Sequence, residues 1–214
     1  MLHIYSFPTF NLTKLLYTAE ELGMPYTSHL LKIGEHKKPE HLARHPMGKV
    51  PAAELNGQYY FESNSICRLM AELNGNKLYG NTPEQRAHIN EWMDVLSQQF
   101  GRWLSTYFFE EAVKPGLLKG QTNPAAVEEA AGLSKQELPV LDKVLGSRRF
   151  IAGNDITLAD TIGFSVFSVK EVTSMDLSAY PNIETWYQAM KARPSYARAL
   201  ANLPNSNMFA VFGK

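Results

Sequence analysis

The chain has 214 residues, 44% hydrophobic and 20% charged, which supplies a buried core and suits one large domain or two small ones. Lysine plus arginine (21) equals aspartate plus glutamate (21), so the bulk charge gives no electrostatic basis for binding nucleic acid. The single cysteine, Cys67, excludes an internal disulfide and a cysteine-rich zinc site, and the six histidines lack a paired ligand pattern, so no metal site is expected.

No targeting or membrane segment is expected. The first eight residues are not a basic leader followed by a long apolar core, and no uninterrupted apolar run approaches about 18 residues, the length that spans a membrane. We therefore expect an untargeted cytoplasmic protein with no membrane partner.

The first eighty residues predict a small mixed sheet with helices on its faces. Pro8 and Gly23 separate β-prone runs from a stretch of helical spacing, and Asn56-Gly57 is the strongest hairpin signal in the chain. The expected order is a βαβ unit, an irregular link and a ββα unit. These are a strand at 2–6, a helix at 12–22, a strand at 26–33, the link at 34–45, strands at 50–55 and 58–61, and a helix from 63 onward.

A domain boundary is expected after this sheet. Residues 74–83 have two glycines, several Asn or Thr residues and a proline, a composition typical of a linker. Beyond it the spacing is helical, with expected helices at 84–113, 124–145, 158–172, 182–192 and 195–200. We predict an α/β domain at 1–75, a linker at 76–83 and an all-α helical bundle at 84–214.

Two features near the hairpin have both a structural and a ligand-binding interpretation. Pro51, after Lys49 and Val50, is most simply a trans proline at a strand start, whereas a cis bond would free the Val50 backbone to pair with a peptide-like ligand. Ser63 is most simply an N-cap. The N–H groups above it would also suit a carboxylate, with Glu62 accepting from an ammonium group.

Two further features lie in the link and before the first helix. His36, Lys37 and Lys38 either hold a second carboxylate or form a solvated loop. Thr9 and Asn11 follow the first strand, where α/β proteins bind ligands, and are either site residues or helix caps only.

Taken together, these residues resemble the cytosolic glutathione transferase family over essentially the whole chain. Lys49-Val50-Pro51 resembles the family's cis-proline loop, and Phe61-Glu62-Ser63-Asn64-Ser65-Ile66 resembles its signature for the γ-glutamyl end of glutathione. Residues 34–42 are similar to the phi-class segment that holds the glycyl carboxylate. Thr157 with Asp160 resembles the family's buried helix start, a structural capping motif. The resemblance implies a thioredoxin-like N-terminal domain with a mixed four-stranded sheet, followed by the all-α domain.

The resemblance also implies that glutathione, as cosubstrate, supplies the reacting thiol. Thr9-x-Asn11-x-x-Lys14 is similar to the nu class and related bacterial members, which use Thr and Asn at the sulfur. The Tyr of other classes falls at Ser6, and the Ser or Cys of others falls near Phe10. We expect Thr9 to donate to the thiolate with Asn11 in support. One such bond lowers a thiol pKa by about one to two units.

The same resemblance implies the groups that hold the tripeptide. Two residues at the helix start take the γ-glutamyl end, one backbone pairs with the cysteinyl unit, and cationic side chains surround the glycyl carboxylate. The expected set is His36, Lys37, Lys49, Val50, Glu62 and Ser63.

Aromatic residues are expected to form the pocket for the electrophile. Trp103, Tyr107 and Phe108 lie near one helical face, and we expect Phe10, Trp103 and Tyr107 to line the pocket. Because the family pairs as two-fold dimers across this region, a homodimer is expected and some aromatics would be interface anchors. Cys67 lies on a helix without a partner cysteine and is expected to be inert.

The predicted function is a glutathione-dependent transferase that activates the thiol for attack on a small hydrophobic electrophile or a disulfide. Disulfide-bond reductase or peroxidase activity is the second form of this prediction, because nu-like members are associated with it. Two alternatives stay open: an interaction module that keeps the fold without turnover, and an isomerase or dehalogenase that uses the same thiol.

Overall fold

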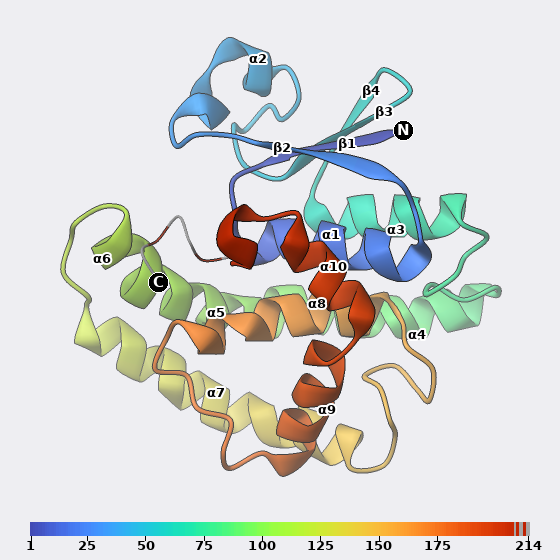
Figure 1. Cartoon of the computed structure of the whole chain (residues 1–214). Coiled ribbons are helices and arrows are strands. Elements are labelled where there is room, and N and C mark those ends of the chain that lie inside the picture. Colours follow the sequence, from blue (N-terminus) through green and yellow to red (C-terminus); the bar gives the residue numbers. More distant parts are fainter. Residues whose placement is uncertain (208, 210–211, 213–214) are drawn as a thin grey trace.

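The computed structural model describes residues 1–207, 209 and 212. Figure 1 shows a small sheet at one end of the molecule, helices α1 and α3 against one of its faces, and a larger helical layer beyond them. The sheet order is β2-β1-β3-β4, with β1 parallel to β2, β1 antiparallel to β3, and β3 antiparallel to β4. Its elements are β1 (Leu2–Ser6), α1 (Phe10–Leu22), β2 (Tyr26–Leu30), α2 (Pro39–Leu42), β3 (Ala52–Leu55), β4 (Gln58–Phe61) and α3 (Ser63–Leu73). The predicted mixed four-stranded sheet is confirmed.

Local chemistry sets the ends of these elements. The Thr9 hydroxyl accepts from the Leu12 N–H at 3.3 Å and so begins α1, while Gly23 ends the helix at φ +68°, a conformation that glycine adopts without a steric cost. The Asn56-Gly57 turn has positive φ at both residues, as a tight hairpin requires.

The link between β2 and β3 differs from the expectation. It contains a short 3₁₀ turn at Glu35–Lys37 as well as α2, and the flanking strands are shorter than predicted. The Val50–Pro51 peptide bond is cis. The spacing argument, which favoured a trans proline, was therefore wrong, and the family resemblance gave the correct isomer.

Beyond α3, the regular elements of the described chain are helices, joined by loops and one isolated bridge between Phe150 and Gly153. Where one long helix was expected at 84–113, α-helical segments alternate with two π-helical turns, and these turns shift the phase of the side chains around the axis. The elements are α4 (Pro83–Asp94), the π turns Val95–Phe100 and Phe109–Val113, α5 (Gly101–Phe108), α6 (Lys114–Gly116), α7 (Pro124–Leu145), α8 (Leu158–Phe167), α9 (Pro181–Lys191) and α10 (Pro194–Ala201), with 3₁₀ turns at Ser168–Glu171 and Pro204–Ser206.

Helix α1 joins the two layers, because it packs on α8 and α10 as well as on α3. The buried Thr18 and Thr161 hydroxyls lie 2.8 Å apart, and the Tyr17 hydroxyl donates to the Met190 carbonyl at 2.8 Å. Buried hydrophobic residues of both layers form one continuous cluster. The sheet layer and the helical layer are thus held together by a shared core.

Asp160 is the buried polar anchor of the helical layer. Its carboxylate accepts from the Thr157 N–H (2.8 Å) and hydroxyl (3.0 Å), from the Ile151 N–H (2.8 Å) and from the Trp186 indole N–H (3.0 Å). Burial raises the pKa of this carboxyl to about 6, and the four donors oppose that shift. The expected helix start at Thr157 and Asp160 is observed, and it is structural.

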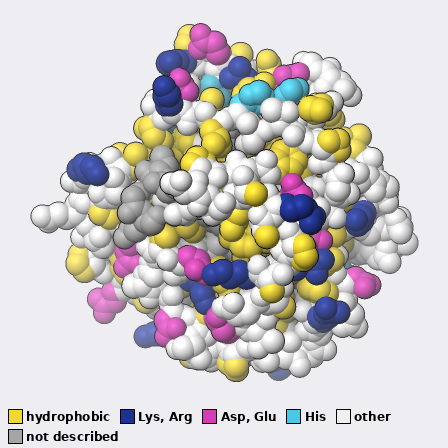
Figure 2. Space-filling view, in the orientation of Figure 1, with side chains coloured by type: hydrophobic (Ala, Val, Ile, Leu, Met, Phe, Trp, Pro, Cys, Tyr) yellow, Lys and Arg dark blue, Asp and Glu magenta, His cyan; other side chains and the backbone are white. Residues whose placement is uncertain are grey.

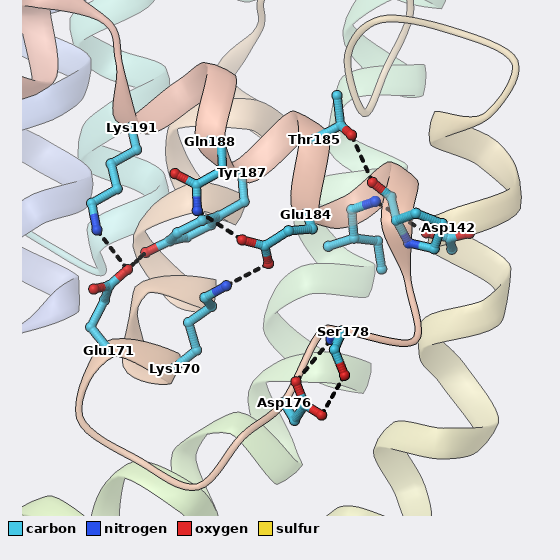
Figure 3. A network of polar contacts seen from close by, with 12 residues as sticks. Asp142, Lys170, Glu171, Asp176, Ser178, Glu184, Thr185, Tyr187, Gln188 and Lys191 are labelled. Atoms are coloured by element: carbon cyan, nitrogen blue, oxygen red, sulfur yellow. Dashed lines mark hydrogen bonds and ion pairs between the residues drawn. The ribbon is translucent and has the colours of Figure 1, made fainter.

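A second polar network fixes α9 (Figure 3). The Asp142 carboxylate of α7 accepts from the Asn182 and Ile183 N–H groups at 2.9 and 3.1 Å, in the first turn of α9. Glu184 of α9 pairs with Lys170 of the 3₁₀ turn that follows α8. These contacts stabilise the helical layer on the side away from the sheet.

Two surface observations complete the fold. On the face shown in Figure 2, basic and acidic side chains are interspersed, and histidines are visible on the sheet domain. Within the described residues, every helix is too short or too polar to cross a membrane.

Candidate active site

Two adjoining clefts lie where the sheet layer meets the helical layer. We call the first, of about 320 Å³, the polar cleft, because it is lined by Lys14, His45, Glu62 and Ser63 among others. We call the second, of about 380 Å³, the apolar cleft, because the residues that line only this cleft include three phenylalanines and a valine in addition to Thr9, His36 and Lys37. The residues that line both are Phe10, Asn11, Lys49, Val50 and Ser105. The two clefts therefore adjoin, and a ligand bound in the polar cleft can extend to the edge of the apolar cleft.

The start of α3 forms one wall of the polar cleft. Glu62 is the N-cap residue at φ +66°, an uncommon conformation for a non-glycine residue that concentrates at functional sites. Ser63 was expected to be the cap but is the first helical residue, and no side chain caps this helix. The first N–H groups of α3 are therefore available to an anion, with the Glu62 carboxylate beside them.

Thr9 and Asn11 stand at the start of α1, where the sequence placed them. Thr9 lines the apolar cleft and caps α1 through its oxygen, which leaves the hydroxyl proton available to a further acceptor. Asn11 lines both clefts, and its oxygen accepts from the Ser63 hydroxyl at 3.5 Å. The two interpretations of Thr9 are thus compatible, since its cap and donor roles use different atoms.

The cationic side chains expected around a carboxylate lie at the apolar cleft but differ in availability. The Lys37 ammonium donates to the carbonyls of Met47 (3.4 Å) and Gly48 (2.8 Å), so it braces the loop. Burial, with the nearby Lys37 charge, lowers the pKa of His36. Lys49 is exposed and lines both clefts. Lys49 is therefore the cation of this set best placed to meet a carboxylate.

Two cleft residues were missed by the sequence analysis as site residues. Lys14 is only 6% exposed and His45 only 2%, yet both line the polar cleft beside Glu62. Burial lowers the pKa of His45, an effect that the Glu62 charge opposes. A lysine inside the apolar run of residues 12–16 was the available signal for Lys14, because a buried lysine needs a partner.

The expected aromatic pocket is corrected by the structure. Trp103 and Tyr107 are buried at 1% and 5% exposure and line neither cleft; the Trp103 N–H donates to Glu137 of α7 at 2.6 Å. Phe10 does line both clefts and packs edge-on against Phe108 at 5.3 Å between ring centroids. The aromatic wall is completed by Phe7, Phe108, Phe109 and Val113.

The described residues offer no alternative centre for thiol or metal chemistry within the protein. Cys67 is fully buried, donates to the Lys14 carbonyl at 3.7 Å, and has a pKa raised to about 11 by burial. Among residues 1–207, 209 and 212, no three His, Cys, Asp or Glu side chains are grouped to hold a metal ion. A reacting thiol would have to come from the ligand.

Comparison with known proteins places this geometry in a family. Residues 12–73 match the family model described as the glutathione S-transferase N-terminal domain, and residues 103–194 match that of the C-terminal domain. A relative from Zea mays, glutathione S-transferase 1, is 31% identical over 90% of this chain and 92% of its own length. The chain belongs to the glutathione S-transferase family.

Solved structures of this family share the whole fold. A glutathione S-transferase I bound to lactoylglutathione superposes with a TM-score of 0.86 at 32% identity, covering 94% of this chain and 99% of that one. A maize glutathione S-transferase I in complex with an atrazine glutathione conjugate gives 0.87 at 31% identity, covering 94% and 97%. The arrangement of sheet, α1 and helical layer that forms the clefts is therefore a family arrangement.

Proposed function

We propose that this chain is a glutathione-dependent transferase, which holds the γ-glutamyl end of glutathione in the polar cleft, its thiol at the junction of the two clefts, and its glycyl end at the wall of the apolar cleft formed by His36 and Lys37. One observation supports this proposal most directly. A carboxylate, an uncapped helix start and hydrogen-bond donors line one cleft, and the apolar cleft adjoins it. The related structures hold glutathione conjugates, in which the tripeptide and an electrophile are joined. Glutathione is accordingly the cosubstrate.

Each end of the tripeptide has a complementary group in the cleft. Glu62 accepts from the γ-glutamyl ammonium, and the N–H groups at Ser63 bind the adjacent carboxylate. The Val50 backbone pairs with the cysteinyl unit as an added strand would. Lys49 meets the glycyl carboxylate, with His36 and the braced Lys37 at the same wall.

The Thr9 hydroxyl activates the thiol in this proposal. A free thiol has a pKa near about 8.5, so only a few per cent is thiolate at neutral pH. A hydroxyl hydrogen bond to the sulfur anion stabilises it by roughly 1.5–3 kcal/mol, which lowers the pKa by about one to two units. The Asn11 amide adds a second donor. The sulfur lone pair then forms a bond to an electrophilic carbon, and the leaving group departs with the electrons of the broken bond.

The electrophile occupies the apolar cleft, against Phe10, Phe108 and Phe109. Conjugation of a small hydrophobic electrophile there is the chemistry of detoxification. Attack on a disulfide, with expulsion of a thiolate, is the second candidate, because Thr9-x-Asn11 is similar to the nu class and related bacterial members. The phi-like segment at residues 34–42 supports the same placement of the glycyl end.

We also propose a cytoplasmic homodimer, with an α/β domain at 1–75, a linker at 76–83 and the helical domain at 84–214. The turns between α3 and α4 support the position of the linker. Sedimentation equilibrium at micromolar protein tests the dimer, which predicts twice the chain mass.

Retention on immobilised glutathione tests the function. Glu62→Ala should abolish retention of the protein, because the ligand ammonium loses its acceptor. Glu72→Ala, an exposed residue of the same helix, is the matched control and should be retained like the parent. Equal retention of the Glu62 variant and the parent would contradict the γ-glutamyl assignment, and a parent that showed no calorimetric heat with glutathione would favour the interaction module.

A further inference from the structure

Lys14 is a buried cation in the polar cleft without an anionic partner of its own. It is 6% exposed, and its ammonium lies over the Phe10 ring, 5.6 Å from the ring centroid. The Lys14 carbonyl accepts from the Cys67 thiol, but among the described residues no hydrogen bond or ion pair engages the Lys14 ammonium. A lysine is rarely buried in this way unless something pairs with its charge.

The groups around Lys14 point to the nature of the missing partner. Glu62, the N-cap residue of α3, and Cys67 within that helix interact with Lys14 electrostatically, while His45 and Lys49 line the same cleft from the segment between β2 and β3. Glu62 attracts the ammonium, but the ion pairs of the described residues include none between Lys14 and Glu62 within 4.0 Å. The uncapped start of α3 lies at the same cleft and adds positive potential. Lys14 and the helix start together therefore present positive charge beside one carboxylate.

Positive and negative groups placed side by side match an α-amino acid end, which carries an ammonium and a carboxylate on one carbon. Glu62 suits the ammonium, and the helix start supplies N–H donors to the carboxylate. Lys14 supplies the full positive charge that these dipoles lack. We propose that the Lys14 ammonium binds the α-carboxylate of the γ-glutamyl residue of glutathione, and that Lys14 and Glu62 together select ligands with a free zwitterionic end.

This inference rests on the proposed function, and it deepens the same site. Lys14 lies in α1, one helical turn beyond Phe10 and Asn11, whereas His45 and Lys49 line the same cleft from the segment between β2 and β3. The glycyl carboxylate is assigned to Lys49. The two lysines are thereby assigned to opposite ends of the tripeptide, which makes them separable by experiment.

The test compares two ligands on two variants. The first ligand is S-methylglutathione, and the second is its analogue with 4-aminobutyrate in place of the γ-glutamyl residue, which lacks only the α-carboxylate. Lys14→Met should weaken binding of the first ligand by roughly ten- to hundredfold, the value of a charge-assisted hydrogen bond. Binding of the second should change less than twofold. Lys49→Met is the matched control and should weaken both ligands by the same factor.

The outcomes separate this inference from the proposed function. A parent protein that binds neither ligand in calorimetry overturns the proposed function itself. A parent that binds both, with Lys14→Met weakening both equally, overturns the assignment of Lys14. If Lys14→Met does not fold, the parent labelled with ¹³C-lysine decides. S-methylglutathione should raise the pKa of Lys14 and the analogue should not, and equal shifts with both ligands contradict the assignment.

Discussion

The Ser63 hydroxyl and the Asn11 side-chain oxygen lie 3.5 Å apart, and this contact joins the first turn of α3 to the first turn of α1. Because the Asn11 oxygen accepts from Ser63, its amide N–H₂ is left to donate elsewhere, and Asn11 lines both clefts. The residue that holds one end of the tripeptide in our proposal thus orients a donor for the sulfur at its middle. Binding and activation share one structural element.

Removal of the Thr9 hydroxyl is expected to remove most of the thiol activation. Thr9→Ala should raise the thiol pKa of bound glutathione by about one to two units and lower kcat/KM by roughly ten- to hundredfold. Thr9→Ser should retain both. Ultraviolet titration of the thiolate gives the pKa, and assays with an aromatic halide and with a small disulfide give the rates.

The control for Thr9 must also lose a helix cap. Thr82 caps α4 by accepting from the Gln85 N–H at 3.3 Å, so Thr82→Ala loses a similar cap, worth about 1 kcal/mol, away from the clefts. It should keep the parent rates. Equal rates for Thr9→Ala and the parent with both substrates would remove Thr9 from the mechanism.

The sequence predicted the sheet and most helices because those signals are local. Asn56-Gly57 and the alternation around it specify a hairpin without help from distant residues. The electrophile pocket was harder, since Trp103, Tyr107 and Phe108 share one apolar face of α5. The periodicity shows that this face is buried, but not that α7 receives Trp103 while the cleft receives Phe108.

The remaining site residues depend on contacts between distant segments. His45 comes from the link and Lys14 from α1, and the tertiary fold brings both to one cleft with Glu62. Local spacing also favoured a trans Pro51. The sequence motifs therefore led to the γ-glutamyl and thiol positions that we propose, while the charged side chains of Lys14 and His45 beside them were found only from the fold.

Phe109 is expected to determine affinity for the electrophile. It is 45% exposed and lines the apolar cleft, so a bound electrophile can cover the exposed part of this side chain. Phe109→Ser removes that apolar contact. The KM for an aromatic chloride should rise roughly two- to tenfold, with the KM for glutathione unchanged. Leu118→Ser is the control, since Leu118 is 59% exposed and lines neither cleft. A rise in both KM values would place Phe109 outside the electrophile pocket.

Asp160 is expected to be a stability residue with no part in chemistry. Asp160→Ala leaves the buried N–H groups of Ile151 and Trp186 without an acceptor, at about 1–3 kcal/mol each. The free energy of unfolding should fall by about 2–6 kcal/mol in urea. The neighbouring exposed Asp155 gives the control, and Asp155→Ala should change it by less than about 0.5 kcal/mol. A loss below about 1 kcal/mol for Asp160→Ala would contradict the anchor role.

Glutathione affinity is expected to fall as the pH rises through about 8. Burial lowers the pKa of Lys14 to about 8, while the nearby Cys67 and Glu62 oppose that shift. The ligand carboxylate binds the protonated lysine, so deprotonation of Lys14 in the free enzyme above that pH weakens binding, by at most tenfold per pH unit.

The other titratable groups near Lys14 do not explain such a change. Burial raises the pKa of Cys67 to about 11 and lowers the pKa of His45 below its ordinary value, so neither side chain changes its charge appreciably between about pH 7.5 and 9.5. Lys14→Arg keeps its charge across this range, because an arginine pKa exceeds about 12. The ratio of the Kd of the parent to that of Lys14→Arg for S-methylglutathione should therefore rise with pH, since the ligand's own ammonium titrates equally in both measurements. A ratio that stays constant from pH 7 to 9.5 would show that the bound carboxylate does not depend on the charge of Lys14.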